Sequence, residues 1–525
     1  MTVGGGTLIA EDNSIQDVTS ITITNNSTLD VAGESYESHQ PVTVSGTGVG
    51  GEGAIYSSAN AYPTENFAIT LAGNTTFGGV GRWDLTGGSI NGPYTLTLAW
   101  QDPSQSSYSQ WTSVSVGANV AGIILTNANP SVTQVLGVIG MDNSFQNTAT
   151  MFTVSTNSQL LFYGGSWNGS LHILDGGSVQ TSQSVANFTG KTITFENGGQ
   201  FISYSFSASQ SVDSAIVLNG TALLTIGDHN IDYTNVISGP GGMLIQQYNH
   251  ELVLSAANTY SGPTIINSGP EIALAGSGSI SQSPLIFFGG GTATSTHIDV
   301  SGRTDDTLTL ASGQTLEGIG AINGNLDVSA GADITPGGTN TTLGITTGSN
   351  PVGTLAASGN VTLAGTTTIK LDGSTNDVIA AAGQITYGGT LNLVNISGTP
   401  LAAGNSFQVF QSGTSTYNSS FPIVSPTTPG AGLTWDLSHL NTGLIKVAGS
   451  TGPVIGSTTV SGGNLILTGS GGTASGPYSV LTTTNLTLPL TSWTQVATGT
   501  YSATGTFTNA IAIVPGVPQS FYIIK

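Results

Sequence analysis

The sequence predicts an all-β chain, and three features of its residue pattern support that fold class. First, apolar and polar residues alternate with period two in short segments such as 20–24, 307–310 and 368–371, which places one set of side chains in a core and the other in water. Second, these segments end at Gly, Asn-Gly or Ser-Gly, which permit tight turns. Third, no segment carries an apolar stripe of helical period and length. Short strands between small-residue corners are typical of a sandwich, a propeller or a solenoid.

The composition favours one elongated repeat structure over several globular domains. Of the 525 residues, 6% are charged, 38% are hydrophobic and 75 are Gly. Because ordinary soluble chains carry about 25% charged residues, the surface of this chain is expected to be made of hydroxyl and amide groups. The apolar fraction also separates the chain from disordered sequences, which are poor in apolar residues.

The net charge of −21 restricts the partners that the chain can bind. An acidic surface repels the phosphates of nucleic acids and anionic membranes, so we expect no nucleic-acid partner. Six Lys and Arg residues are too few to compensate a polyanionic glycan. No run of about 18 apolar residues occurs, so no membrane span is expected. Residues 1–6 lack the pattern of a signal peptide, which leaves an export leader either missing or removed.

The stretch from 237 to 267 carries a phrase that is typical of repeated coils. Residues 239–245 read Gly-Pro-Gly-Gly-Met-Leu-Ile, and residues 251–262 read Glu-Leu-Val-Leu-Ser-Ala-Ala-Asn-Thr-Tyr-Ser-Gly. The phrase resembles the autotransporter-associated β-strand repeat, although residues 246–250 replace the Lys and Gly that the family has there. The resemblance implies a right-handed parallel β-helix (β-solenoid), like the passenger region of an autotransporter, in a bacterial protein that is secreted or displayed at the cell surface.

Four regions are expected along the chain. Residues 1–345 should form the parallel β-helix, with about 12 to 16 stacked coils, because a coil of roughly 20 to 30 residues cannot bury its apolar face alone. Residues 346–448 should continue or cap the solenoid. The Gly, Ser, Thr and Pro of residues 449–460 indicate a linker, and the strand phrases of residues 461–525 indicate a small C-terminal β-sandwich-like domain.

Aromatic residues in the first third of the chain are candidates for binding a neutral glycan. Exposed rings can stack on sugars, and such a surface needs no cations. The alternative is that these rings fill the core of the solenoid or cover its end. The candidate stacking residues are Trp83, Trp100, Tyr108, Trp111 and Trp167, with Tyr163 close to them in the sequence.

Acidic residues could provide a glycosidase-type pair, in which a protonated and an ionised carboxyl lie about 5 to 9.5 Å apart. The candidate acidic site consists of Asp84, Asp228 and Asp232, and further carboxyls lie at Asp102, Asp142, Asp175 and Asp213. Asp beside Gly or Asn is also a common turn residue, so each has a structural alternative. The phrase Asp-His-Asn-Ile-Asp at 228–232 offers too few ligands for a metal site, and we expect neither a metal nor a cofactor.

Three functions remain open on the sequence alone. The leading one is a noncatalytic extracellular structural or adhesive protein, which could assemble into fibres or contact surface glycans because the ends of a solenoid are open β edges. The second is a polysaccharide-active β-helix enzyme, a glycoside hydrolase or lyase, which needs two or three carboxylates, with His229 or Arg82, in an aromatic-lined groove. The third is a neutral-glycan-binding module, which needs a flat exposed row of Trp or Tyr.

Overall fold

The computed structural model describes most of the chain from residue 1 to residue 525. Outside the description are residues 12–13, 25, 33, 60–63, 82, 101–107, 128–133, 140–145, 163–165, 182–188, 204–208, 248–249, 268, 270, 291–295, 349, 415–416, 431, 450–451 and 473–474. The side chains of 37–38, 100, 108, 134–139, 166, 189–190, 210 and 247 are outside it as well. The chain divides into two compact units, Met1–Val361 and Thr362–Lys525.

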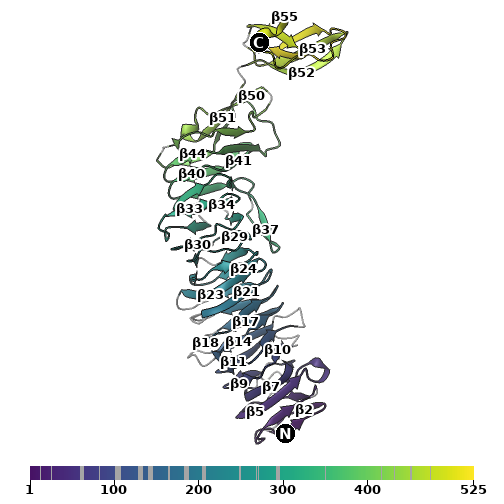
Figure 1. The fold of residues 1–525 in the computed structure, drawn as a ribbon, viewed down its shortest axis with the longest axis vertical. Helices are drawn as coiled ribbons and strands as arrows, with labels where there is room; N and C mark the ends of the chain where they lie inside the picture. Colours follow the sequence, from purple (N-terminus) through teal and green to yellow (C-terminus); the bar gives the residue numbers. More distant parts are fainter. Residues whose placement is uncertain are drawn as a thin grey trace. The chain divides into compact units, whose positions relative to one another are not determined.

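The fold is a parallel β-solenoid of about 14 turns, which confirms the predicted fold class. In the first unit, β24 (Ala222–Ile226) pairs with β27 (Met243–Gln247), and β27 pairs with β29 (Thr264–Ile266), always in parallel. Figure 1 shows β24 and β29 stacked above β21 (Thr189–Phe195). Each coil therefore supplies the backbone hydrogen-bond partners of the next coil. Within the described residues, no helix is long and apolar enough to cross a membrane.

Columns of apolar side chains form the core of the first unit. Leu224, Ile245 and Ile266 occupy the same register on successive coils, and all three are buried. Because side chains alternate along a strand, the residues between them face outward. Burying one such side chain contributes roughly 1.5–3 kcal/mol, so the coils are stable only as a stack.

A glycine allows one long strand to turn a corner of the solenoid. β34 (Thr315–Asn323) pairs with β36 (Asp333–Pro336) through its first residues and with β39 (Thr354–Ala357) through its last residues. Gly318 lies between these two parts with a φ of 106°. A Cβ there would lie 2.0 Å from the carbonyl oxygen of Phe288, so the corner requires glycine both for its backbone angle and for space.

We expect the Gly318→Ala substitution to lower the free energy of unfolding by roughly 1–3 kcal/mol or more. Gly313→Ala is the matched control, because Gly313 also has a positive φ, of 86°, but a Cβ there meets no atom within 4 Å. Urea unfolding of both variants separates the strain of the backbone from the clash. Equal losses in the two variants would show that the close approach to Phe288 has no cost.

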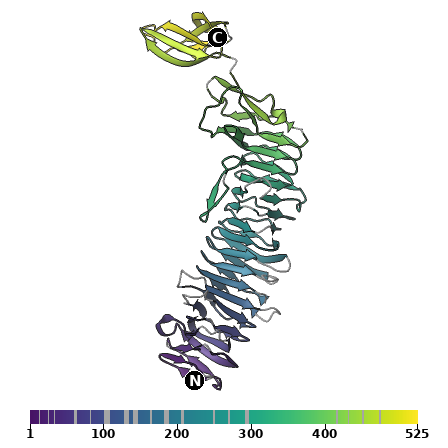
Figure 2. The same cartoon turned by 180° about the vertical axis from the view of Figure 1, so that it is seen from behind.

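A hairpin covers part of the outer surface of the first unit. β37 (Asn340–Thr342) and β38 (Ile345–Thr347) pair antiparallel, and both views show the hairpin lying along the side of the coils (Figures 1 and 2). Leu343 and Ile345 pack against an outward-facing apolar column, which is buried although it lies outside the solenoid core. The column consists of Leu244, Ile265 and Phe287, with Leu223 and Leu285 at its edges.

The second unit contains further parallel coils and a small antiparallel sheet. β41 (Thr366–Asp372) pairs in parallel with β45 (Thr390–Asn395). β51 (Leu444–Gly449) then pairs antiparallel with both β46 (Ser406–Gln408) and β50 (Leu433–Asp436). The region predicted to continue or cap the solenoid therefore contains both parallel coils and an antiparallel sheet.

The last part of the second unit is a pair of three-stranded antiparallel sheets. The two sheets enclose a small core of Leu467, Tyr478, Val480, Tyr501, Phe507, Ile511 and Ile524. One sheet consists of β52 (Val454–Ser461), β53 (Asn464–Ser470) and β56 (Phe507–Ala512). The other consists of β54 (Pro477–Thr483), β55 (Thr494–Thr500) and β57 (Phe521–Ile524). We refer to residues 454–525 as the C-terminal module.

The C-terminal module begins earlier than the sequence indicated. Most of the predicted linker at 449–460 belongs to β52, which pairs with β53 from Val454 to Ser461. The Gly, Ser and Thr of this segment are typical of a linker, but Thr and Val are also strand formers. The antiparallel partner, which lies just beyond the segment, decides between the two structures.

Candidate functional site

Three of the five candidate stacking rings are buried. The prediction of a sugar-stacking surface is therefore wrong for Trp83, Trp111 and Trp167. Trp83 and Trp111 are each 1% exposed, and Trp167 is 3% exposed. The indole N–H of Trp83 donates to the carbonyl oxygen of Gly78 at 2.9 Å, and that of Trp167 to Gly169 at 2.7 Å. A buried ring whose N–H already has a backbone partner fills the core and cannot present a face to a sugar.

The rings of Trp111 and Trp167 form one aromatic cluster inside the solenoid. The ring of Phe152 lies 6.4 Å from that of Trp111 and 4.5 Å from that of Trp167, both edge to face. Trp100 and Tyr108 belong to strands, but their side chains lie outside the described part of the chain, as does all of Tyr163. Their predicted role in glycan binding stays a prediction.

The structure does not bring the three candidate carboxyls together. Asp84 begins β8 (Asp84–Thr86), and its Oδ1 accepts a hydrogen bond from the backbone N–H of Gln110 at 2.8 Å. Asp228 follows β24, which lies six paired strands further along the stack. At about 4.8 Å per strand, that is roughly 29 Å. Asp84 therefore cannot act together with Asp228 or Asp232.

Four other ionisable side chains do gather on one outward face of the solenoid. Glu251, Glu271 and His297 occupy the same register on β28 (Glu251–Leu254), β30 (Glu271–Leu274) and β32 (His297–Asp299). Asp299 lies two residues after His297 and hence on the same face. We call Glu251, Glu271, His297 and Asp299 the acidic ladder.

Direct contacts hold each side chain of the acidic ladder in place. Oε2 of Glu271 lies 2.9 Å from Nε2 of His297. At one end, the side-chain amide of Asn230 donates to Oε2 of Glu251 at 2.9 Å. The backbone N–H of Ser301 donates to Oδ1 of Asp299 at 2.7 Å. Asp232, one of the predicted residues, lies a coil before Glu251 and accepts from Ser255 at 2.8 Å. It is a neighbour of the ladder because its strand, β25 (Ile231–Tyr233), pairs in parallel with β28.

The pKa values of two carboxyls in the ladder are shifted in opposite directions. Burial raises the pKa of Glu271, and repulsion by Glu251 raises it further, while His297 opposes both effects. Burial also raises the pKa of Asp299, but hydrogen bonds from Ser301 and Asn323 and the charge of His297 outweigh it, so the pKa of Asp299 is lowered. One face of the solenoid thus carries a carboxyl that favours its proton and another that favours its charge.

We expect the Glu251→Gln substitution to lower the pKa of Glu271, because it removes the like charge in the neighbouring strand. His297→Asn should have the opposite effect, because it removes the positive charge that stabilises the carboxylate. Titration of the Glu271 side-chain carboxyl by NMR measures both shifts. A pKa that moves in the same direction in the two variants would contradict this account of the ladder.

The remaining residues named from the sequence do not join the ladder. The ring of His229 stacks on that of His250, with centroids 5.8 Å apart. Asp213 accepts a hydrogen bond from Thr234 at 3.0 Å. Arg82, Asp102 and Asp142 lie outside the described residues. Over the part of the chain that is described, no group of three or more His, Cys, Asp and Glu side chains could hold a metal ion.

Three similar phrases could have revealed the acidic ladder in the sequence. Residues 251–254, 271–274 and 297–300 read Glu-Leu-Val-Leu, Glu-Ile-Ala-Leu and His-Ile-Asp-Val. In each phrase the first and third residues face outward, and the second and fourth are buried aliphatic residues. Aligning the phrases therefore places Glu251, Glu271 and His297 in one column. Unequal coil lengths hide this alignment from a search for a fixed period.

Comparison with known proteins adds no family. No protein-family model matches the sequence, and no curated protein is detectably similar to it. The fold defines the chain as a parallel β-solenoid, a class that includes both structural and enzymatic proteins. The resemblance to the autotransporter-associated repeat therefore rests on the sequence alone, on the phrases between residues 237 and 338 and on a looser likeness at residues 79–88.

Proposed function

We propose that the protein is a noncatalytic structural or adhesive β-solenoid that acts outside the cell, either secreted or at the cell surface. The observation that carries this proposal is the stack itself, in which successive parallel strands share both a hydrogen-bond ladder and buried columns such as Leu224, Ile245 and Ile266. Such a stack extends a chain into a scaffold whose outward residues can vary freely.

The surface chemistry supports an extracellular role. The chain has no Cys, so it needs no disulfide pairing during export. Most of its polar residues are uncharged, and they can accept and donate hydrogen bonds to neutral glycans at the cell surface. The resemblance to autotransporter passenger regions points the same way.

Electron microscopy of the full chain at several concentrations, combined with limited proteolysis, tests the structural role. We expect rods that resist protease, and filaments if the chains assemble. Compact particles that are digested rapidly at coil corners would contradict the proposal, because the ladder leaves few backbone groups free for a protease.

A polysaccharide-active function is the second candidate, and the acidic ladder is the observation that favours it. Glu271 and Asp299 are diagonal neighbours on adjacent parallel strands, so their Cα atoms lie roughly 8 Å apart, given about 4.8 Å between strands and about 3.3 Å of rise per residue. Their pKa values are shifted apart, as a general acid and a general base require. Glycosidases hold their two carboxyls about 5 to 9.5 Å apart, a separation that side chains on such neighbouring positions can reach.

Release of reducing ends from neutral polysaccharides tests this second candidate. Glu271→Gln should abolish any release, because it removes the proton donor. Glu196→Gln is the matched control, since Glu196 makes a similar 2.9 Å contact with His172 but its pKa is lowered. If the wild-type chain releases no reducing ends, or if all three proteins release them equally, the polysaccharide-active function is contradicted and the noncatalytic role is retained.

A further inference from the structure

The C-terminal module differs in charge from the rest of the chain. All 27 acidic residues lie at or before Asp436, and after Lys446 the only charged side chain is that of Lys525. The module therefore has no carboxyl side chain, while the preceding residues carry the whole negative charge. Two copies of the chain that approach through their acidic coils repel each other, but contact through the module meets no such repulsion.

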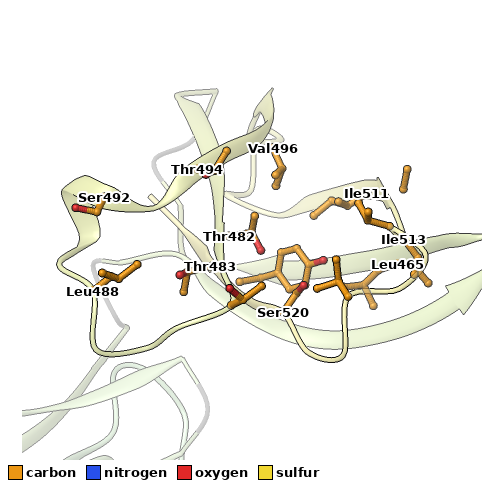
Figure 3. Close-up of a pocket in the computed structure, with 15 residues that line it drawn as sticks. Leu465, Thr482, Thr483, Leu488, Ser492, Thr494, Val496, Ile511, Ile513 and Ser520 are labelled. Carbon is orange, nitrogen blue, oxygen red and sulfur yellow. The ribbon is translucent and has the colours of Figure 1, made fainter.

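A cavity of about 540 Å³ opens at the surface of this uncharged module. Figure 3 shows Leu488 and Ser492 on one side of it and Leu465, Ile511 and Ile513 on the other. The side that carries Leu488 is held in place by the indole N–H of Trp493, which donates to the carbonyl oxygen of Leu488 at 3.1 Å. The cavity is thus part of the folded module.

Aliphatic side chains around the cavity are unusually exposed. Leu488, Val496, Ile513, Val514 and Val517 all line it and are between 40% and 65% exposed. We call these five residues the apolar rim. Contiguous apolar surface of this kind marks an interaction site in a soluble protein, and small domains have little core with which to cover it.

We propose that the apolar rim is the surface through which a second copy of this chain docks, module against module. The absence of charge from the lining excludes a charged ligand, which would lose its hydration without a partner. Among the described lining residues Tyr522 is the single aromatic one, so stacking on a sugar has little support. A two-fold contact lets the same apolar patch serve as both surfaces.

The inference rests on the proposed structural role, because self-association is what such a scaffold needs in order to assemble. The two can fail separately. Rods and protease resistance test the scaffold, whereas the mass of the particles in solution tests only the contact between modules.

Analytical ultracentrifugation of the full chain over a range of concentrations tests the contact. We expect the particle mass to rise with concentration towards that of two chains, and Val514→Asp to weaken this association at least tenfold. Val460→Asp is the matched control, because Val460 lies on the same module and is 69% exposed, against 65% for Val514, but does not line the cavity. If Val514→Asp fails to fold, Val517→Asp replaces it.

Salt concentration provides a second readout. Salt screens the repulsion between the acidic coils, because the Debye length falls from about 30 Å at 0.01 M to about 3 Å at 1 M. The association should therefore be stronger at about 0.5 M than at about 0.02 M salt. A wild-type chain that stays single at every concentration overturns the proposal. So does equal weakening by Val514→Asp and Val460→Asp, or dissociation at high salt, which would show an ionic contact elsewhere.

Discussion

In alkaline solution the Glu65→Gln variant is expected to have a larger free energy of unfolding than the wild-type protein. This advantage should be several kcal/mol greater at pH 9 than at pH 4. Glu65 lies in β7 (Thr64–Gly79), opposite Tyr36 and Leu85 on the adjacent coils, and is fully buried. Burial raises the pKa of Glu65 from 4.5 to about 9, although the backbone of Tyr36 opposes the shift. At neutral pH the native protein therefore holds this carboxyl in its protonated form.

The direction of the pH dependence follows from the two states of Glu65. The unfolded chain releases the proton near pH 4.5, whereas the folded chain keeps it until about pH 9. The stability of the wild-type protein is therefore complete below pH 4.5 and is lost progressively as the pH rises to 9, by up to about 1.4 kcal/mol per pH unit. Glutamine has no proton to lose, so the variant avoids this loss.

Urea unfolding at pH 4, 7 and 9 measures the effect. The difference at pH 4 serves as the baseline, because a protonated carboxyl and an amide are close in shape. Glu52→Gln is the control, since Glu52 is exposed and lies on a nearby coil. A constant difference between Glu65→Gln and the wild-type protein across the three pH values would show that Glu65 is ionised in the native state.

The fold class could be predicted because it depends on a local pattern. The alternation of polar and apolar residues in segments such as Thr307–Leu310 indicates which side chains are buried. The repetition of such segments along the chain predicts stacked coils. The hairpin at β37 and β38 could not be predicted in this way, because its fold depends on contacts that are distant in sequence, between Leu343 or Ile345 and the outer column. The strand β52 was hidden by a composition that suits either a linker or a strand.

The site was harder to predict, because the type of a side chain does not show whether it points into the core or outward. Trp111 is a plausible sugar platform by composition, but it lies in register with Leu85 in an inward column. Glu251 and Glu271 begin similar phrases, but the unequal lengths of the coils hide their alignment, and the strand pairing shows that they are neighbours. In a solenoid, function depends on which residues share a register, and corners of varying length conceal that register.

The Phe287→Ala variant is expected to lose about 3–5 kcal/mol of stability and to release the hairpin from the coils. Phe287 is fully buried in the outer column, against which Leu343 and Ile345 of the hairpin pack. Removing the ring leaves a cavity beneath the hairpin, which has no long strand ladder of its own to hold it. Backbone amides of residues 340–347 should then exchange with solvent much faster.

Phe288→Ala is the matched control for the hairpin, because Phe288 is the next residue, is equally buried and faces the opposite side of the same strand. It should destabilise the solenoid core by a similar amount while leaving exchange in residues 340–347 slow under native conditions. Hydrogen exchange measured by mass spectrometry compares the two variants directly. If both variants release the hairpin equally, its attachment depends on the integrity of the coils as a whole. Release by Phe287→Ala alone would show that a single outward column holds it, and that an outer face of the solenoid can recruit a distant segment of the chain.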